Sequence, residues 1–453
     1  MRGAQPGLRF IPPQYNPWLN RLIRLLLPAW LRFRLRITQV QVEGAEELVT
    51  WYDRLQRGEA RLLLAFRHPT LDDPYAMLYL LARAVPQAAR RIGVRLRLPL
   101  HSYFVYDRGI PLWAGRWVGW LFAQLGGIPI QRGRSDRLAL KTIREVLLRG
   151  DMPLTVAPEG GINSLSERLG PLEPGLAQMG FWCLEDLVKQ GQVVPVVIVP
   201  IGLQYSFVRP PWSSINGVLA RLESYCHLPV ISSLPTEPAD RLAQLYTRLL
   251  RLADYLLNQM EAFYAQFYHH PRPTLADDLT VNDRLRLRLD HLRDVALQVT
   301  ESFLGLTAEG SVIDRCRRIE AVAREWIYRQ DLATLSPVAR GLADRIAQEA
   351  ELRLWHMQLV EQLTSVTDDY LREKPSADRF GEVVLILWSV VNHLRGRHQP
   401  LRLGDRRLTL RVGKALCLND YWPTYCTGRK AARQVVQDVT DRLAERLQGL
   451  ISS

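Results

Sequence analysis

The sequence predicts an α/β fold, a mixed sheet with flanking helices, joined to a mostly helical insertion or second domain. Short apolar runs typical of buried strands alternate with amphipathic helical patterns up to about residue 236. Long amphipathic helical patterns then replace the strands between 237 and 400, and a strand-like run followed by a helical pattern returns after 401. We therefore expect an α/β domain at 37–236, a helical segment at 237–400, and a strand and helix at 401–453. If 401–453 returns to the first sheet, the helical segment is an insertion.

The individual elements follow from apolar periodicity and from turn residues. Strands are expected at 37–42, 62–66, 98–106, 128–130, 153–157, 192–201 and 407–412. Helices are expected at 46–57, 74–85, 174–189 and 429–450, and in the helical segment at 239–268, 283–304, 311–330, 337–363 and 379–394. One more helix ends at 148 and is expected to be capped by Ser135 or Asp136, because both side chains are good N-caps. No short repeat period is evident.

Charge and cysteine content limit the classes of function. The 453 residues carry a formal net charge of +13, with a pI of about 9.7. Such a basic chain favours an acidic partner, namely anionic lipid, nucleic acid or an acidic carrier protein. No nucleic-acid-binding motif is present, so nucleic acid is not expected. The five cysteines are far apart and form no CxxC pair, which favours a reduced, cytoplasmic protein without a metal site.

The N-terminal 36 residues predict a basic amphipathic helix at a membrane interface. Residues 18–35, WLNRLIRLLLPAWLRFRL, alternate large apolar residues with arginines, which suits the headgroup region of an anionic bilayer. Residues 113–125, WAGRWVGWLFAQL, carry three tryptophans and could also dip into a membrane. For both stretches the alternative is a helix that covers the protein's own core. No signal peptide is expected at 1–14, and no charge-free window is long enough for a clean span.

The stretch 61–75, RLLLAFRHPTLDDPY, predicts a strand, a polar turn and a helix, which places His68 just past the carboxyl end of a strand. A histidine there can act as a general base, because its unperturbed pKa is about 6.5. Asp73 could hold the other ring nitrogen and fix the tautomer. The alternative for Asp73 is a helix cap, since Thr70 and Asp73 have the spacing of a capping box. With Asp73 paired to His68, Asp72 becomes the expected cap or helix-dipole residue.

Two later turns could complete a substrate site with Arg132, Glu159, Gly160 and Gly161. Arg132 ends the run LGGIPIQR, and its planar guanidinium suits a phosphate or carboxylate; the alternative is a solvated residue in a basic run. Glu159 could accept a hydrogen bond from a substrate hydroxyl, while Gly160 and Gly161 allow close approach of the backbone. The alternative for PEGG is a plain turn.

Four motifs in this order resemble those of the glycerolipid acyltransferase family, of the 1-acyl-sn-glycerol-3-phosphate acyltransferase type. They are HPTLDD with its His-x4-Asp spacing, GGIPIQR, PEG, and the apolar strand QVVPVVIVPI at 192–201. The sequence departs from the family pattern after PEG, where Gly161 and Ile162 stand in place of the usual Thr and Arg.

The resemblance implies that a fatty acyl group moves from a thioester, acyl-CoA or acyl-ACP, to a hydroxyl of a lysophospholipid or glycerol-phosphate-like acceptor. It implies His68 and Asp73 as catalytic residues, and Arg132, Glu159, Gly160 and Gly161 as substrate-binding residues. No permanently bound cofactor and no metal are expected. The expected location is the cytoplasmic face of a membrane, as a peripheral or monotopic protein. The alternatives are a neutral lipid or other alcohol as acceptor, and a non-catalytic membrane-binding scaffold.

Overall fold

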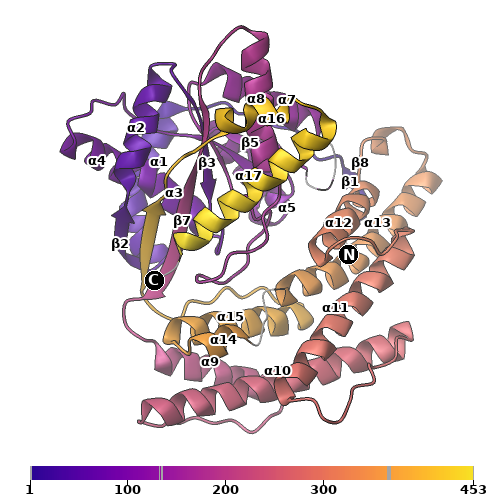
Figure 1. The fold of residues 1–453 in the computed structure, drawn as a ribbon. Helices are drawn as coiled ribbons and strands as arrows, with labels where there is room; N and C mark the ends of the chain where they lie inside the picture. The colour runs from indigo at the N-terminus through magenta and orange to yellow at the C-terminus, as the bar shows by residue number, and fades with distance from the viewer. Residues whose placement is uncertain (1–2, 132, 134–135, 365–368, 452–453) are drawn as a thin grey trace. The chain divides into compact units, whose positions relative to one another are not determined.

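The computed structural model describes residues 3–131, 133, 136–364 and 369–451, which form two compact units (Figure 1). The α/β unit comprises 9–131, 136–208 and 405–451, and the helical unit comprises 3–8, 133, 209–364 and 369–404. The α/β unit is therefore interrupted after Val208, and not after residue 236 as the sequence predicts. The segment 209–236 belongs to the helical unit because it contains a helix, α9 (Trp212–Tyr225), that packs on α10 and α15.

The α/β unit is built on one mixed sheet with the strand order β2-β9-β7-β3-β6-β4-β5, which confirms the predicted fold class. The strands are β2 (Ile37–Glu43), β3 (Arg61–Phe66), β4 (Tyr103–Asp107), β5 (Gly127–Ile130), β6 (Leu154–Val156), β7 (Val196–Phe207), β9 (Arg406–Val412) and β10 (Leu416–Cys417). Strands β3, β4, β5, β6 and β7 run parallel, whereas β9 lies antiparallel to β7, and β10 pairs with β7 off the main path. Strand β9 thus returns to the sheet after the helical unit.

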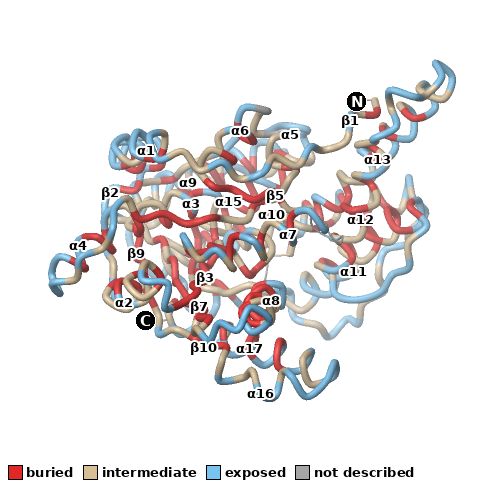
Figure 2. The backbone as a smooth tube through the Cα atoms, turned by 90° about the horizontal axis from the view of Figure 1, so that it is seen from above, coloured by how far each residue is buried: buried red, intermediate tan, exposed pale blue. Residues whose placement is uncertain are grey.

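Strand β3 lies inside the sheet between β6 and β7, and it is buried on both faces because helices cover both faces of the sheet. Its side chains alternate, so that Leu62, Leu64 and Phe66 enter one apolar core while Leu63 and Ala65 enter the other. Figure 2 shows the strand buried along its length. The carboxyl end of β3 is therefore held from both sides and is a rigid support for the turn that follows.

Helices cover both faces of this sheet. One face carries α1 (Pro17–Ala29), the π-helical η1 (Trp30–Arg34), α2 (Ala45–Gln56), α3 (Asp73–Tyr79), the π-helical η2 (Leu80–Ala84) and α4 (Val85–Arg91). The other carries α7 (Arg137–Arg149), α8 (Gly175–Lys189) and α17 (Arg429–Gly449), with η4 (Leu418–Tyr421). The short helices α5 (Ile110–Ala114), α6 (Arg116–Gln124) and α16 (Trp422–Tyr425) complete the unit. The Asp136 side chain caps α7 by accepting from the Ala139 amide, while Ser135 lies outside the described residues.

The helix after His68 is longer than the sequence predicts. Helices α3, η2 and α4 follow one another without a break, so the helix expected at 74–85 extends to Arg91. The π-helical turn of η2 ends at Ala84, two residues before Pro86, which has no amide hydrogen and cannot continue the regular ladder. A proline thus changes the hydrogen-bond pattern without ending the helix.

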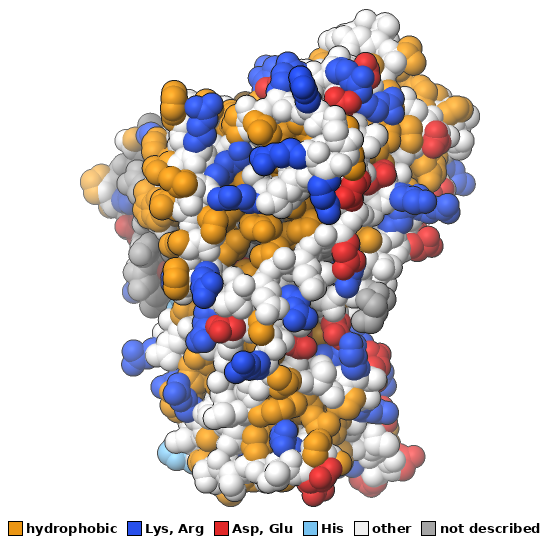
Figure 3. Space-filling view, turned by 90° about the vertical axis from the view of Figure 1, so that its left-hand side faces the viewer, with side chains coloured by type: hydrophobic (Ala, Val, Ile, Leu, Met, Phe, Trp, Pro, Cys, Tyr) orange, Lys and Arg blue, Asp and Glu red, His pale blue; other side chains and the backbone are white. Residues whose placement is uncertain are grey.

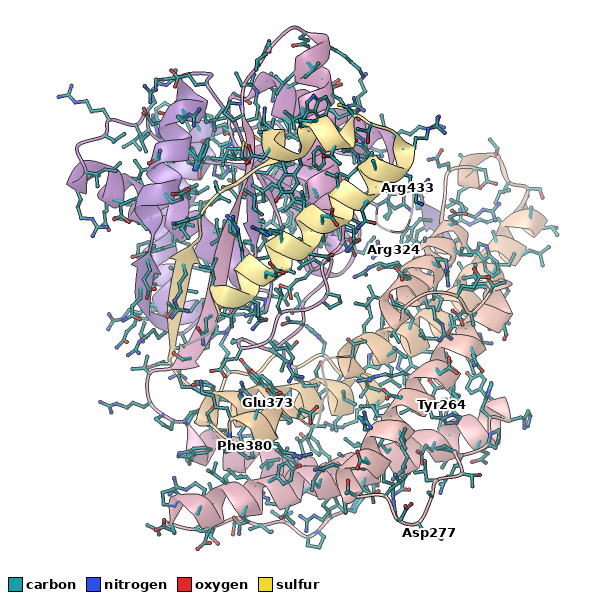
Figure 4. All side chains as sticks on the ribbon, viewed as in Figure 1. Tyr264, Asp277, Arg324, Glu373, Phe380 and Arg433 are labelled. Carbon is teal, nitrogen blue, oxygen red and sulfur yellow. The ribbon has the colours of Figure 1, made fainter. Side chains whose placement is uncertain are left out.

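The helical unit consists of long helices connected in sequence. They are α9, α10 (Pro238–Tyr268), α11 (Val281–Leu304), α12 (Val312–Ile327), α13 (Pro337–Leu363), α14 (Asp369–Glu373) and α15 (Ala377–Leu394), with η3 (Leu332–Thr334) and a two-stranded pairing of β1 (Gln5–Pro6) with β8 (Tyr328–Arg329). Tyr264 of α10 and Phe380 of α15 are almost fully buried among these helices (Figure 4). Over the described residues, no helix is both long and apolar enough to cross a membrane.

Three successive helix contacts in this unit use the same buried ion pair, although the sequence shows no short repeat. In each, an arginine binds a glutamate of the preceding helix through two hydrogen bonds. Its third nitrogen binds an Asn or Asp about two helical turns before that glutamate. The three sets are Arg248 with Glu223 and Asn216, Arg288 with Glu261 and Asp254, and Arg315 with Glu301 and Asp294. The pairs fix the register of α9, α10, α11 and α12.

Candidate active site

The parallel strands β3, β6 and β7 end at the same edge of the sheet and bring the predicted motifs together. His68 follows β3 after one residue, Glu159 lies in the turn after β6, and Tyr205 lies near the end of β7. The edge formed by the carboxyl ends of parallel strands is where α/β proteins usually bind substrates.

His68 and Asp73 are in direct contact. The Nδ1 atom of His68 is 2.8 Å from Oδ2 of Asp73. A carboxylate accepts hydrogen bonds, so Nδ1 carries the proton and Nε2 keeps its lone pair. About one fifth of the His68 side chain is exposed (20%), and Nε2 has no hydrogen-bond partner in the part of the chain that the structure describes. This nitrogen is therefore open to an incoming hydroxyl group.

Asp73 is fully buried and accepts hydrogen bonds from four groups. Besides His68, the donors are the Thr70 amide at 2.8 Å, the Thr70 hydroxyl at 3.1 Å and the Tyr205 hydroxyl at 2.7 Å. Asp73 is also the first residue of α3, where the helix dipole favours a negative charge. Asp73 contacts Thr70 and His68 at the same time. It can therefore hold the turn at the start of α3 and also orient the imidazole of His68.

Asp72 occupies the N-cap position of α3, but its side chain makes no capping hydrogen bond. Its carboxylate instead forms an ion pair with Arg406 of β9. Asp72 is therefore not a side-chain cap, because its carboxylate binds a cation from a distant strand and not the local amide groups. Its position at the N-terminus of α3 still suits the helix dipole, which is the other role that the sequence predicts.

Glu159 is buried and its carboxylate contacts the protein itself. Oε1 accepts from the His68 amide at 2.7 Å, and Oε2 accepts from Asn163 Nδ2 at 2.7 Å and from the Gly170 amide at 2.8 Å. Burial raises the pKa of this carboxyl, an effect that the nearby Arg67 guanidinium opposes. Glu159 thus ties the backbone of His68 to the loop that follows β6.

Arg67 binds the same loop through a second set of hydrogen bonds. Its guanidinium is fully buried and donates to the carbonyl groups of Ser166 (2.6 Å) and Leu203 (3.1 Å), and also to those of Leu165 and Arg168. Arg67 donates to carbonyl groups of the loop, while Glu159 accepts from its amide groups. The two charges together hold the loop beside His68 in one conformation.

The remaining predicted residues have different outcomes. Gly160 has φ +64°, a left-handed conformation that favours glycine, and a Cβ there would also force the Glu173 carboxylate to move. Gly161 is a half-buried bend residue beside it. Arg132 lies outside the described residues.

Sequence reasoning missed Arg67, Tyr205 and Arg406. Arg67 directly precedes His68, but a basic residue at a strand end is usually exposed, so only its position next to the motif could have drawn attention. Tyr205 lies beyond the predicted end of its strand at 201, and nothing local marks Arg406.

The α/β unit also has a surface groove that lies apart from these residues. The groove, of about 560 Å³, lies between α7 and α8 and is lined by Leu140, Trp182 and charged side chains, and by none of the site residues. In the described parts of the chain, no cluster of His, Cys, Asp and Glu side chains could hold a metal ion.

Comparison with known proteins identifies the family of the α/β unit. The sequence model of the Acyltransferase family matches residues 39–203, a range that begins in β2 and ends in β7. No match was found among curated proteins or among solved structures. The matched range contains His68, Asp73 and Glu159 in the arrangement described above. Residues 39–203 are therefore an acyltransferase domain of the glycerolipid acyltransferase family, which supports acyl transfer as the activity of this domain.

Proposed function

We propose that the protein transfers a fatty acyl group from an acyl thioester, acyl-CoA or acyl-ACP, to the hydroxyl of a lysophospholipid or glycerol-phosphate-like acceptor. The observation that carries this proposal is the contact between His68 Nδ1 and Asp73, which leaves Nε2 of a partly exposed imidazole open. An alcohol is a weak nucleophile at neutral pH and needs a base of this kind.

In the proposed reaction, His68 Nε2 takes the proton of the acceptor hydroxyl while its oxygen attacks the thioester carbonyl. The C–O bond forms as a tetrahedral intermediate develops. The C–S bond then breaks, and the imidazolium gives its proton to the departing thiolate. The products are an ester and a free thiol, and Asp73 stabilises the imidazolium throughout.

The acceptor can be identified by direct competition. Purified protein would be given a labelled acyl thioester with lysophosphatidate, glycerol 3-phosphate or a neutral monoacylglycerol. We expect ester formation fastest with a phosphate-bearing acceptor. Preference for the neutral acceptor would favour the alternative that the natural acceptor is a neutral lipid or other alcohol. Residues 159–166 suggest this alternative because they contain no Lys or Arg that could bind a phosphate. No ester with any acceptor, together with retained lipid binding, would favour a non-catalytic scaffold.

The proposed location is the cytoplasmic face of a membrane, reached through an apolar and basic surface. Residues 1–42 contain no Asp or Glu. Helices α1 and η1 expose large apolar side chains, namely Trp18, Leu22, Leu25, Leu26, Trp30 and Phe33, and α6 adds Trp117 and Trp120. Figure 3 shows hydrophobic side chains along the left-hand edge of the α/β unit with basic side chains beside them. Such a surface suits an anionic bilayer interface.

The exposed helices are firmly attached to the α/β unit. Arg24, on the inner side of α1, donates to the carbonyl groups of Leu81 and Leu100, and burial lowers its pKa. The amides of Gln14 and Asn16 bind carbonyl groups at the end of α6, so α1 and α6 lie on the same side of the unit (Figure 2). One side of α1 therefore packs on the core, while the other side is exposed and is the side that we propose meets the membrane.

Replacing Trp18, Leu25 and Phe33 together by serine is expected to weaken binding to anionic vesicles by at least about a hundredfold. Each large side chain contributes about 1.5–3 kcal/mol when it leaves water, and all three are at least 72% exposed, so folding should be unaffected. Vesicle flotation measures the binding. The control is Val193→Ser, because Val193 is 92% exposed but lies outside these helices. Equal binding of both variants would contradict the proposed membrane surface.

A further inference from the structure

The catalytic carboxylate is held by a strand position beyond the matched range 39–203. Asp73 uses Oδ2 for His68, and its other oxygen, Oδ1, accepts from the hydroxyl of Tyr205 on β7 at 2.7 Å. Tyr205 is almost fully buried, at 4% exposure. Burial raises its pKa well above the usual value, and the negative charge of Asp73 adds to this effect. The hydroxyl therefore stays protonated and donates.

Arg406 of β9 contacts both Tyr205 and the neighbouring acid. Its guanidinium carbon lies 4.9 Å from the centre of the Tyr205 ring, and Nη2 forms the ion pair with Asp72. The same nitrogen donates to the Leu35 carbonyl at 3.0 Å. Arg406 thus links the end of η1, the start of α3 and the tyrosine that holds Asp73.

A carboxylate that orients a histidine must not rotate. Oδ1 accepts from the Tyr205 hydroxyl at 2.7 Å and, over the longer distance of 3.1 Å, from the Thr70 hydroxyl. With the shorter of these bonds lost, the group could turn more easily about its Cβ–Cγ bond and draw Oδ2 away from Nδ1. The Tyr205 hydroxyl opposes this rotation, and Arg406 packs on the Tyr205 ring and holds it in place. The antiparallel register pairs Tyr205 with Leu408 and Phe207 with Arg406. Tyr205 and Arg406 are therefore diagonal neighbours on the same face of the sheet.

We propose that Tyr205 and Arg406 are positioning residues for the His68–Asp73 pair, so that the strand following the helical unit completes the active site. This inference rests on the proposed function for its kinetic test. It goes beyond that function because neither residue belongs to the recognised motifs. The chain passes to the helical unit just after β7 and returns from it just before β9. At this point the Val208 amide donates a hydrogen bond to the Asp405 carbonyl.

Tyr205→Phe is expected to lower kcat about tenfold while KM for the thioester and for the acceptor changes less than about twofold. The decisive measurement is a double-mutant cycle with Asp73→Asn. If Tyr205 acts through Asp73, the tyrosine substitution should lower kcat less than about twofold in the Asp73→Asn protein. Arg406→Met should lower kcat in the same way by a smaller factor.

Tyr52→Phe is the matched control, because Tyr52 is a buried tyrosine of the same unit whose hydroxyl donates to the His101 carbonyl. It loses a comparable hydrogen bond and should keep its kcat. Arg411→Met is the control on β9, since Arg411 pairs with Glu43. A tenfold loss in both the wild-type and the Asp73→Asn backgrounds, or no loss in either, would overturn the inference.

A second measurement does not depend on activity. With ¹³C-labelled histidine, the ring signal of His68, assigned by its absence in His68→Ala, should shift in Tyr205→Phe and not in Tyr52→Phe. Wild-type protein that transfers no acyl group would contradict the proposed function, yet this shift would still support the positioning role. An unchanged His68 signal in an active enzyme would contradict the positioning role alone.

Discussion

Replacing His68 by alanine is expected to lower kcat for acyl transfer by about a thousandfold or more, with KM nearly unchanged. The substitution removes the Nε2 lone pair that takes the hydroxyl proton, and general-base catalysis is typically worth 10²–10⁴-fold. Asp73→Asn should lower kcat by a similar order, because an amide can hold the imidazole in the wrong tautomer. Initial rates with a labelled acyl thioester and the best acceptor measure both effects.

His398→Ala is the control for this prediction, because His398 is an exposed histidine. It should retain wild-type kcat. Circular dichroism would show whether His68→Ala keeps its fold. We expect that it does, because the His68 side chain is partly exposed at the edge of the sheet and does not form part of the apolar core. A His68→Ala enzyme with more than about a tenth of wild-type kcat would mean that another group takes the proton.

The parts of the site that local sequence determines could be predicted. The apolar run of β3, the polar turn and the proline at the start of α3 all lie within a few residues of His68, so their structure follows from local patterns. The contact between His68 and Asp73 is equally local, since both lie in one turn.

Other parts of the site depend on pairing between distant segments. Tyr205 meets Asp73 because β7 continues past Ile201 to Phe207, and Arg406 arrives on β9 after the whole helical unit. No periodicity indicates which distant strand will pair with β7. The role of Glu159 could not be anticipated for the same reason, because its partners Asn163 and Gly170 reach it only once the loop has folded.

The overall fold was predictable at the level of class and of most elements. Long helices such as α10 and α13 have strong periodic patterns and were predicted within a few residues of their observed ends. The sequence does not predict helix α9. Its apolar residues Ile215, Leu219 and Leu222 have helical spacing, but the stretch is short and follows two prolines, which indicate a loop. Missing it moved the expected domain boundary from Val208 to 236.

Removing one partner of a buried ion pair in the helical unit should strongly destabilise that unit. Glu261→Ala is expected to cost about 3–5 kcal/mol, because it leaves the Arg288 guanidinium buried without its main carboxylate. Arg288 is 8% exposed and binds Glu261 through two hydrogen bonds of 2.8 Å, and these bonds raise its pKa. Urea denaturation would measure the decrease in the free energy of unfolding. Hydrogen exchange of the backbone amides would show whether the decrease lies in α10 and α11.

The double variant Glu261→Leu/Arg288→Met separates the net contribution of the pair from the cost of an unpaired charge. Apolar side chains of similar length leave no buried charge, so the double variant should lose much less stability than Glu261→Ala alone. Arg286→Met is the exposed control, because Arg286 pairs with Asp283 at 3.6 Å with both side chains well exposed, and its loss should cost less than about 1 kcal/mol. If the double variant were as unstable as Glu261→Ala, the pair itself would supply net stability, and its recurrence at three helix contacts would be a source of folding energy as well as of register.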